Sequence, residues 1–274
     1  MVVPLRFYRP GKKYPAFSVT GGRCELQCEH CRGRYLSGMR AVLTSEQLLH
    51  EVSSLEASGG TGFLLSGGCD ARGRVPLGPF LGAVRQIKEG TSLTVNLHPG
   101  LVDAEAARAL LASGADAFSV DVLQDRQVIA GRLHLDASPQ DYRRTLELLS
   151  PGTVVPHVCV GLQSERGEED TLDLLSSVRI EALVVLGLMA PPGFSDGSAV
   201  PTDRLLRFVR QAVRRIDAPV LLGCMRPRGR ADAEIEIIKA GAAGVVNPAS
   251  ATVAWARAAG VEAAEVQACC ALHR

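Results

Sequence analysis

Short apolar runs alternate with amphipathic segments along almost the whole chain of 274 residues. The apolar runs, which we expect to form strands, cover residues 16–20, 62–68, 93–97, 117–122, 153–162, 182–189, 219–224 and 244–246. Apolar residues at helical spacing follow each run, within residues 44–58, 80–88, 103–113, 139–149, 168–178, 202–216, 231–240 and 251–259. Such alternation is typical of a parallel sheet covered by helices. We therefore predict an α/β fold, a single (β/α)8 TIM-type barrel over residues 1–274, with an open doubly wound sheet as the alternative.

Composition and charge narrow the classes of function. The chain has 30 basic and 29 acidic residues, a balance that argues against a dedicated nucleic-acid binder. No apolar run is long enough to cross a membrane, and the first fifteen residues lack the apolar core of a signal peptide. The expected location is the cytoplasm, without a membrane partner. In that compartment eight cysteines indicate metal or redox chemistry rather than disulfides.

Three cysteines lie within one short run directly after the first expected strand. Cys24, Cys28 and Cys31 have the spacing C-x3-C-x2-C. Three thiolates this close can hold an iron–sulfur cluster while one iron keeps no protein ligand. A zinc site with His30 as fourth ligand is the alternative, although structural zinc usually takes two separated ligand pairs.

Together with His30, this motif resembles the radical S-adenosylmethionine (SAM) superfamily. Residues 66–68, Ser-Gly-Gly, are similar to the family's glycine turn for the SAM amino group, although Cys69 stands where glutamate is more usual. Gly161, followed by Gln163 and Ser164, resembles the family's adenine-binding strand. The resemblance covers essentially the whole chain.

The resemblance implies a [4Fe–4S] cluster on the three cysteines, with SAM chelating the iron that has no protein ligand. Reduction by an electron donor such as ferredoxin or flavodoxin would cleave SAM to a 5′-deoxyadenosyl radical, which abstracts hydrogen from an unactivated carbon. Such a radical needs a dry, enclosed site, which a barrel supplies. The cofactor-binding residues we expect are His30, Ser66, Gly67, Gly68, Asp121, Gly161 and Met189.

Five cysteines lie outside the motif, namely Cys69, Cys159, Cys224, Cys269 and Cys270. The first three lie at expected strand ends, where barrel enzymes collect their chemistry. The last two lie on a tail, residues 260–274, that we expect to close over the barrel rim. We interpret the five as candidate ligands of an auxiliary iron–sulfur cluster. The alternative is that a buried cysteine such as Cys159 is simply a small hydrophobic residue.

Within the superfamily the chain is most similar to the biotin-synthase-related branch. Residues 17–39, 66–70, 155–162 and 221–230 resemble one subunit of the two-protein lipoyl synthases of archaea and some bacteria. That resemblance implies sulfur insertion into an octanoyl chain on a carrier protein or lipoyl domain, with a second radical SAM subunit as partner. This sequence lacks the N-terminal cysteine motif of single-protein lipoyl synthase. The auxiliary-cluster ligands of that enzyme therefore cannot be assigned to residues of this chain.

Two other functions stay open at this point. One is a mutase or methylase type of the same branch with a single cluster, and the other is a non-catalytic metal- or cluster-binding assembly factor. Two groups of basic residues also have two interpretations each. Arg226, Arg228 and Arg230 could bind an anion or a cluster edge, or form a solvated loop. Arg6, Arg9, Lys12 and Lys13 could dock an acidic carrier protein, or form a solvated N-terminal segment.

Overall fold

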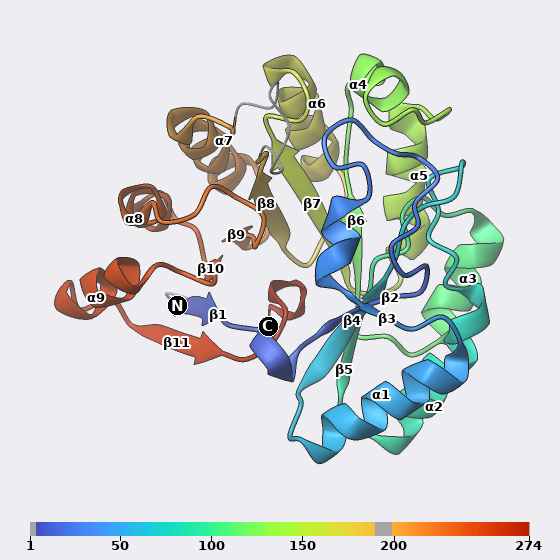
Figure 1. Ribbon diagram of the computed structural model, residues 1–274. Helices are drawn as coiled ribbons and strands as arrows, with labels where there is room; N and C mark the ends of the chain where they lie inside the picture. The colour runs from blue at the N-terminus through green and yellow to red at the C-terminus, as the bar shows by residue number, and fades with distance from the viewer. Residues whose placement is uncertain (1–3, 190–198, 274) are drawn as a thin grey trace.

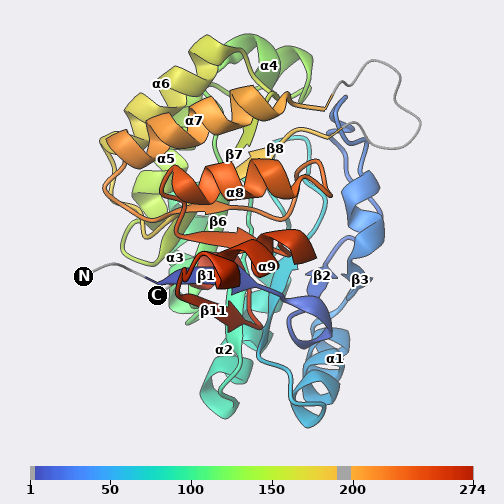
Figure 2. The same cartoon turned by 90° about the vertical axis from the view of Figure 1, so that its left-hand side faces the viewer.

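The computed structural model describes residues 4–189 and 199–273. Within them the strands form one parallel sheet that curls around a concave inner face, with most helices on the outer face (Figures 1 and 2). The strands are β1 (Leu5–Tyr8), β2 (Ala16–Ser18), β3 (Arg40–Ala41), β4 (Gly62–Ser66), β5 (Thr94–Leu97), β6 (Ala117–Asp121), β7 (Val154–Val160), β8 (Leu183–Gly187), β9 (Val220–Leu222), β10 (Gly244–Val246) and β11 (Ala263–Val266). The eight apolar runs in the sequence all form strands, which are β2 and β4 to β10.

The helices follow the expected segments closely. They are α1 (Ser45–Ala57), α2 (Leu81–Gly90), α3 (Ala104–Ala112), α4 (Arg126–Gly131), α5 (Pro139–Leu149), α6 (Glu165–Ser176), α7 (Thr202–Arg215), α8 (Ala231–Lys239) and α9 (Ser250–Ala258). Four single-turn 3-10 segments are η1 (Gly11–Lys13), η2 (Arg34–Gly38), η3 (Gly78–Phe80) and η4 (Cys270–Leu272). The short helix α4, the edge strands β3 and β11, and β1, which lies between β11 and β10, have no counterpart in the sequence prediction.

Side-chain caps fix where several helices begin. The Thr44 side chain accepts a hydrogen bond from the backbone N–H of Gln47, and Asp103 accepts from two such groups at the start of α3. Ser138 and Asp141 form a capping box ahead of α5. These caps satisfy N–H groups that have no partner inside the helix.

The prediction of a closed (β/α)8 barrel is wrong, because the sheet is open. Its edges are β11 and β3, and the order between them is β11-β1-β10-β9-β8-β7-β6-β5-β4-β2-β3. Closure would require β10 to pair with β2. Instead β10 pairs with β1, and β2 pairs with β3, so both sets of backbone groups are already used. The result is a curled half-barrel, and the N-terminal strand that prevents closure is too short for its apolar pattern to stand out.

The two faces of the sheet carry different side chains. Outward residues such as Phe118, Val158 and Val185 pack with the helices in one large apolar core. Inward residues such as Val155, Val184 and Leu221 form a second, smaller apolar cluster. Successive strand residues alternate between the faces, so this division assigns each strand position to one of them.

The C-terminal tail is part of the inner cluster. Cys270 and Ala271 in η4 are buried there, and Figure 1 shows η4 (red) inside the curl of the sheet. Thr61, just before β4, donates its hydroxyl hydrogen to the carbonyl oxygen of Gln267 over 2.5 Å. The end of the tail around η4 therefore lies on the inner face, while Ala263–Val266 of the same tail form the edge strand β11. Burial of the apolar residues of η4 against the strands favours this position. Residue 274 lies outside the described residues.

No helix within residues 4–189 and 199–273 combines the length and the apolar character needed to cross a membrane.

Candidate metal and cofactor site

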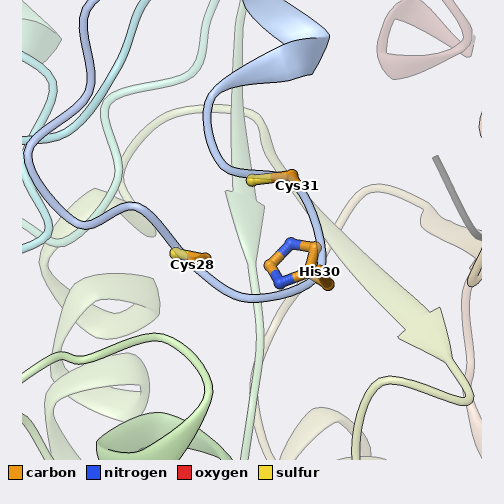
Figure 3. Close-up of side chains that lie close together, drawn as sticks. All are labelled: Cys28, His30 and Cys31. Carbon is orange, nitrogen blue, oxygen red and sulfur yellow. The ribbon is translucent and has the colours of Figure 1, made fainter. Parts of the chain in front are cut away.

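The cysteine loop leaves the sheet at the carboxyl end of β2. The ligating atoms of Cys28, His30 and Cys31 all lie within 4.8 Å of one another. Figure 3 shows the His30 ring and the Cys31 thiol pointing into the bend of the loop. Cys24 does not join this group at that distance, although it lies near enough to Cys28 to raise the pKa of that thiol. The three predicted cysteines thus lie on one loop, with two of them in immediate contact.

Backbone hydrogen bonds hold the loop from two sides. The Glu25 N–H donates to the Cys69 carbonyl oxygen, and the Glu29 N–H donates to the Arg132 carbonyl oxygen, each over 2.8 Å. Cys28 is buried, and its thiol lies 3.6 Å from the Leu133 carbonyl oxygen. The loop is therefore fixed by segments that follow β4 and α4, both far away in sequence.

The loop favours a thiolate. The hydrogen bond from the Cys28 thiol, followed by the effect of the nearby His30, lowers the pKa of Cys31 to about 4, against burial. The same hydrogen bond, together with burial, raises the pKa of Cys28. The Nδ1 atom of His30 is buried without a hydrogen-bond partner. A thiolate beside a second thiol and an unpartnered imidazole nitrogen fits a metal-binding group.

The glycine turn after β4 packs directly against this loop. The Gly68 N–H donates to the hydroxyl oxygen of Thr20 over 2.7 Å. A Cβ at Gly68 would lie 2.0 Å from the Arg23 carbonyl oxygen and 2.7 Å from the Cys24 Cα. Only glycine permits this approach. Ser66 is also in the predicted place, but its hydroxyl donates to the carbonyl oxygen of His98, so it serves to join β4 to β5.

The predicted adenine-binding segment begins at the end of β7. Gly161 has a positive φ of 91°, and its N–H donates to Oε1 of Glu168 over 2.7 Å. Arg204 from α7 forms an ion pair with Glu168 at 2.8 Å. Sequence reasoning missed both residues. The signal for Glu168 is a carboxylate seven positions after a strand-end glycine, whereas Arg204 gives no local signal.

Gln163 and Ser164 have structural partners. The Gln163 side-chain oxygen accepts from the backbone N–H groups of Gln124 and Asp125. Ser164 caps α6, and its hydroxyl donates to Asp125. Their side chains therefore fix the loops around Gly161.

Asp121 and Met189, also predicted to bind cofactor, follow the same end of the sheet. Asp121 ends β6, and its Oδ2 lies 3.3 Å from Nε2 of His98. Partial desolvation by the surrounding strands raises the pKa of the Asp121 carboxyl, but His98 outweighs this effect, and the pKa is lowered to about 2. His157 on β7 stacks on His98 with ring centroids 5.9 Å apart. Sequence reasoning missed His157 because it lies within an apolar run.

The other five cysteines divide into groups. Cys69 lies beside the loop: burial raises its pKa to about 12, with smaller effects in the same direction from Cys24, Asp121, Asp70 and Cys31. Cys224 lies near Cys269 and Cys270 of the tail: burial and then Cys269 raise the pKa of Cys224, and Cys224 is among the groups that raise the pKa of Cys270. The hydrogen bond with Cys270 lowers the pKa of Cys269 to about 7. Cys159, on β7, belongs to neither group. The structure thus brings Cys224 together with the tail.

Of the arginines after β9, Arg226 is structural. It is buried, forms an ion pair with Glu234 at 2.5 Å and donates to the carbonyl oxygens of Gly223 and Val246. Arg226 is therefore neither free to bind an anion nor part of a solvated loop, the two interpretations that the sequence allowed. Arg228 is exposed and donates to the Cys224 carbonyl oxygen, and exposed Arg230 pairs with Asp232.

Comparison with solved structures identifies the fold. Methylornithine synthase (PylB) superposes with a TM-score of 0.61 and 16% identity, over 89% of this chain and 71% of that one. HydG, a maturase of the [FeFe]-hydrogenase, gives 0.65 and 15%, over 89% and 57%. SuiB from Streptococcus suis, solved with S-adenosylmethionine bound, gives 0.59 and 13%, over 82% and 51%. The chain therefore spans little more than half of the last two, and identities this low show a shared fold alone.

The sequence comparisons are more specific. Curated protein sequences gave no match. The family model of the Radical SAM superfamily matches residues 18–175, which is more than half of the chain and includes the cysteine loop, the glycine turn and Gly161. Membership implies a [4Fe–4S] cluster and SAM as cofactors. By this match, and with a fold similar to those of PylB and HydG, the chain is a radical SAM enzyme and belongs to the radical SAM superfamily.

Proposed function

We propose that this radical SAM enzyme inserts sulfur into an unactivated C–H bond, and that the substrate is an octanoyl chain attached to a carrier protein. The observation that carries this proposal is the position of the tail. Cys269 and Cys270 belong to the inner apolar cluster, and both lie close enough to Cys224, which follows β9, to interact with it electrostatically. A second group of thiols can hold an auxiliary cluster, and sulfur insertion needs such a source of sulfur.

In this proposal Cys24, Cys28 and Cys31 hold the [4Fe–4S] cluster. The donor set fits, because the loop stabilises a thiolate at Cys31 and leaves a buried nitrogen of His30 unpartnered. When bound, the cluster and SAM supply a carbon-centred radical that abstracts hydrogen from an unactivated carbon. The chain's own residues keep water from the loop, since Cys28 and Leu26 are buried and the glycine turn packs against Cys24.

The SAM-binding residues of the proposal surround this loop. We assign the amino group of SAM to the turn at Gly67 and Gly68, and the adenine to the backbone at Gly161. Glu168 and Arg204 support that second site by fixing the left-handed conformation of Gly161. His30 and Met189 are the remaining SAM contacts that we propose; Asp121, which the sequence also suggested for SAM, pairs with His98 on the inner face and is left out of this set.

Cys224, Cys269 and Cys270 are the ligands we propose for an auxiliary iron–sulfur cluster that serves as the sulfur source. Cysteine thiolates are the usual ligands of such clusters. The tail brings two of them to the end of β9, and the Asn96 amide donates to the Cys269 sulfur over 3.6 Å. Cys69 and Cys159, which the sequence also suggested, stand apart from this group, so we leave them out of the proposed ligand set.

The proposed partners follow from the resemblance to two-protein lipoyl synthases. They are a second radical SAM subunit, an octanoylated carrier protein or lipoyl domain, and a reductant such as ferredoxin or flavodoxin. The open edges of the half-barrel leave room for a subunit beside β3 or β11.

Iron and sulfide quantitation on anaerobically reconstituted protein tests the ligand sets. The expected content is about two clusters per chain. Replacing Cys224, or both Cys269 and Cys270, with alanine should remove one cluster and leave SAM cleavage to 5′-deoxyadenosine intact. Cys159→Ala is the matched control, and it should keep both clusters. An unchanged iron content in the tail variant contradicts the auxiliary site.

Turnover tests the reaction itself. The protein, its second subunit and an octanoylated lipoyl domain, supplied with SAM and reductant, should give a product that contains sulfur. Formation of 5′-deoxyadenosine with a product free of sulfur would instead identify a mutase or methylase type. Loss of sulfur from the Cys269→Ala/Cys270→Ala product, with 5′-deoxyadenosine retained, would connect the tail to the sulfur source.

One observation favours a second candidate, a protein that binds a single metal ion. The ligating atoms of Cys28, His30 and Cys31 are close enough for one ion, and Zn–S and Zn–N bonds of about 2.0–2.3 Å match such a group. Thiolates of a cluster bind different irons and therefore lie further apart. One zinc per chain, with no SAM cleavage under strong reductant, would establish this candidate.

A further inference from the structure

Three polar side chains from consecutive strands meet on the inner face of the sheet. His98 follows β5, Asp121 ends β6 and His157 lies in β7, where it is the register partner of Asp121. The Nε2 atom of His98 lies 3.3 Å from Oδ2 of Asp121, and the two histidine rings stack at an interplanar angle of 22°. These three residues, the inner triad, form one continuous polar group.

Strand alternation places the triad on the inner face. Val155 belongs to the inner apolar cluster, so His157, two residues later, points to the same side. Ser119 on β6 accepts a hydrogen bond from the Asn96 amide of β5, which fixes the inner side of both strands. Asp121 is two residues beyond Ser119 and therefore also points inward.

The triad lies between the two groups of cysteines. Cys159 is two residues beyond His157 on the same side of β7, toward the end of the sheet that carries the cysteine loop. In the other direction, Asn96 is two residues before His98 and contacts the Cys269 sulfur. The triad therefore lies on the inner face between the level of Cys159 and the Cys269 sulfur.

The carboxylate of Asp121 is accessible from this face. Its side chain is 58% exposed, and among the described residues its sole polar contact is the one with His98, whose side chain is 25% exposed. A charged pair on the inside of a curled sheet is costly, and apolar side chains are the usual filling there. The stability of the fold does not account for an ion pair of His98 and Asp121 at this position, so binding of a ligand explains it better.

The triad presents two hydrogen-bond acceptors. Nδ1 of His157 lies 3.1 Å from the Val155 carbonyl oxygen, so Nδ1 carries the ring hydrogen and Nε2 keeps its lone pair. Asp121 uses one oxygen for His98 and keeps the other. The triad is not a metal site of the usual kind. Among the described residues, the group whose ligating atoms all lie within 4.8 Å of one another is Cys28, His30 and Cys31, not the triad.

We propose that Asp121 and His157 bind an amide N–H group of the substrate, with His98 fixing the orientation of the Asp121 carboxylate. Burial lowers the pKa of His98, but the Asp121 carboxylate outweighs burial and the pKa is raised, which favours protonated His98 and a pair without net charge. A neutral donor matches such a pair better than an ammonium group. This inference does not depend on sulfur insertion: it holds for any amide substrate of the enzyme, and an octanoylated lysine is one example.

The test compares two probes that differ at a single position. N-methylhexanamide carries the amide N–H, and methyl hexanoate has an ester oxygen there whose lone pairs would face the two acceptors. Isothermal titration calorimetry on the reconstituted protein with SAM should show the amide binding at least about tenfold more tightly, because a missing donor leaves both acceptors unpaired.

Two variants and a control complete the experiment. Asp121→Asn and His157→Phe should each remove most of this preference, and His157→Phe keeps a ring in the stack with His98. His50→Gln, on the exposed side of α1, should leave the preference unchanged. Equal binding of the two probes, a preference that survives in both variants, or no measurable binding of the amide overturns the proposal. Circular dichroism confirms that each variant is folded, and N-methylhexanamide binding is independent of whether sulfur is inserted.

Discussion

Gly68 and Arg23 approach so closely that no side chain fits between them. A Cβ at Gly68 would lie 2.0 Å from the Arg23 carbonyl oxygen. This contact joins the turn after β4 to the cysteine loop, which are separated in sequence by the whole of α1. The position of the cysteine loop above the sheet therefore depends on glycine at position 68, because any larger residue would collide with the Arg23 carbonyl oxygen.

Replacing this glycine tests that dependence. Gly68→Ala should displace the cysteine loop and lower the amount of cluster that the reconstituted protein retains, because the obstructing atoms belong to the backbone and cannot rotate away. Iron quantitation and the absorbance of the cluster measure the effect. Gly22→Ala is the matched control, since a Cβ there meets no atom within 4 Å, and its iron content should equal that of the parent protein.

The buried pair of Glu168 and Arg204 should contribute strongly to stability. The Glu168 side chain is 5% exposed and the Arg204 side chain 21%, so removing Arg204 leaves a buried carboxylate without its partner. We expect Arg204→Met to lower the free energy of unfolding by about 2–4 kcal/mol, measured by urea denaturation. Arg166→Met removes an exposed pair with Asp170 near the same helix, and it should cost less than about 0.5 kcal/mol.

The tail should detach more easily in mild acid. The Tyr8 hydroxyl donates to Nδ1 of His273 over 2.6 Å, and burial, with a smaller effect of Arg6, lowers the pKa of His273 from 6.5 to about 4. Between these values the unfolded chain binds the proton and the folded chain does not, so stability falls as the pH drops from 7 toward 4. The loss should be on the order of 2 kcal/mol.

His273→Gln isolates this effect, because glutamine can accept the same hydrogen bond but does not titrate. The urea midpoint of the variant should fall less between pH 7 and pH 5 than that of the parent protein. His50→Gln removes an exposed histidine and should follow the parent curve. Parallel curves for His273→Gln and the parent protein would show that His273 is not the group that responds.

Asp103 has two roles that separate by substitution. Its carboxylate caps α3 and forms a 2.7 Å ion pair with Arg74. Asp103→Asn keeps the cap and loses the exposed ion pair, so stability should change by less than about 0.5 kcal/mol. Asp103→Ala loses both and should cost about 1 kcal/mol, measured by urea denaturation. Equal losses in the two variants would show that the ion pair, and not the cap, stabilises the start of α3.

Several features of the fold can be predicted from the sequence because they are local. The eight apolar runs form β2 and β4 to β10, and caps such as Thr44 and Ser138 begin their helices. The spacing of Cys24, Cys28 and Cys31 likewise needs no distant contact, and the family match bears out the superfamily that it indicated.

Barrel closure, by contrast, is not a local property. It depends on which strand pairs with β10. That strand is β1, four residues long, and the pairing joins opposite ends of the chain. The position of the tail and the grouping of Cys224 with Cys269 and Cys270 are of the same kind.

The sequence by itself determined the order of strands and helices, the cysteine motif and the superfamily, since these depend on residues that lie within a few positions of one another. The tertiary structure alone decided that the sheet stays open, that the tail rests on its inner face and that His98, Asp121 and His157 meet there. The physical reason is that neighbouring parallel strands bring together residues about 20 to 40 positions apart in sequence. The apolar pattern within one strand carries no information about which strand will be its neighbour. The cysteine loop follows the same rule: its spacing is local, and its place against Gly68 is not.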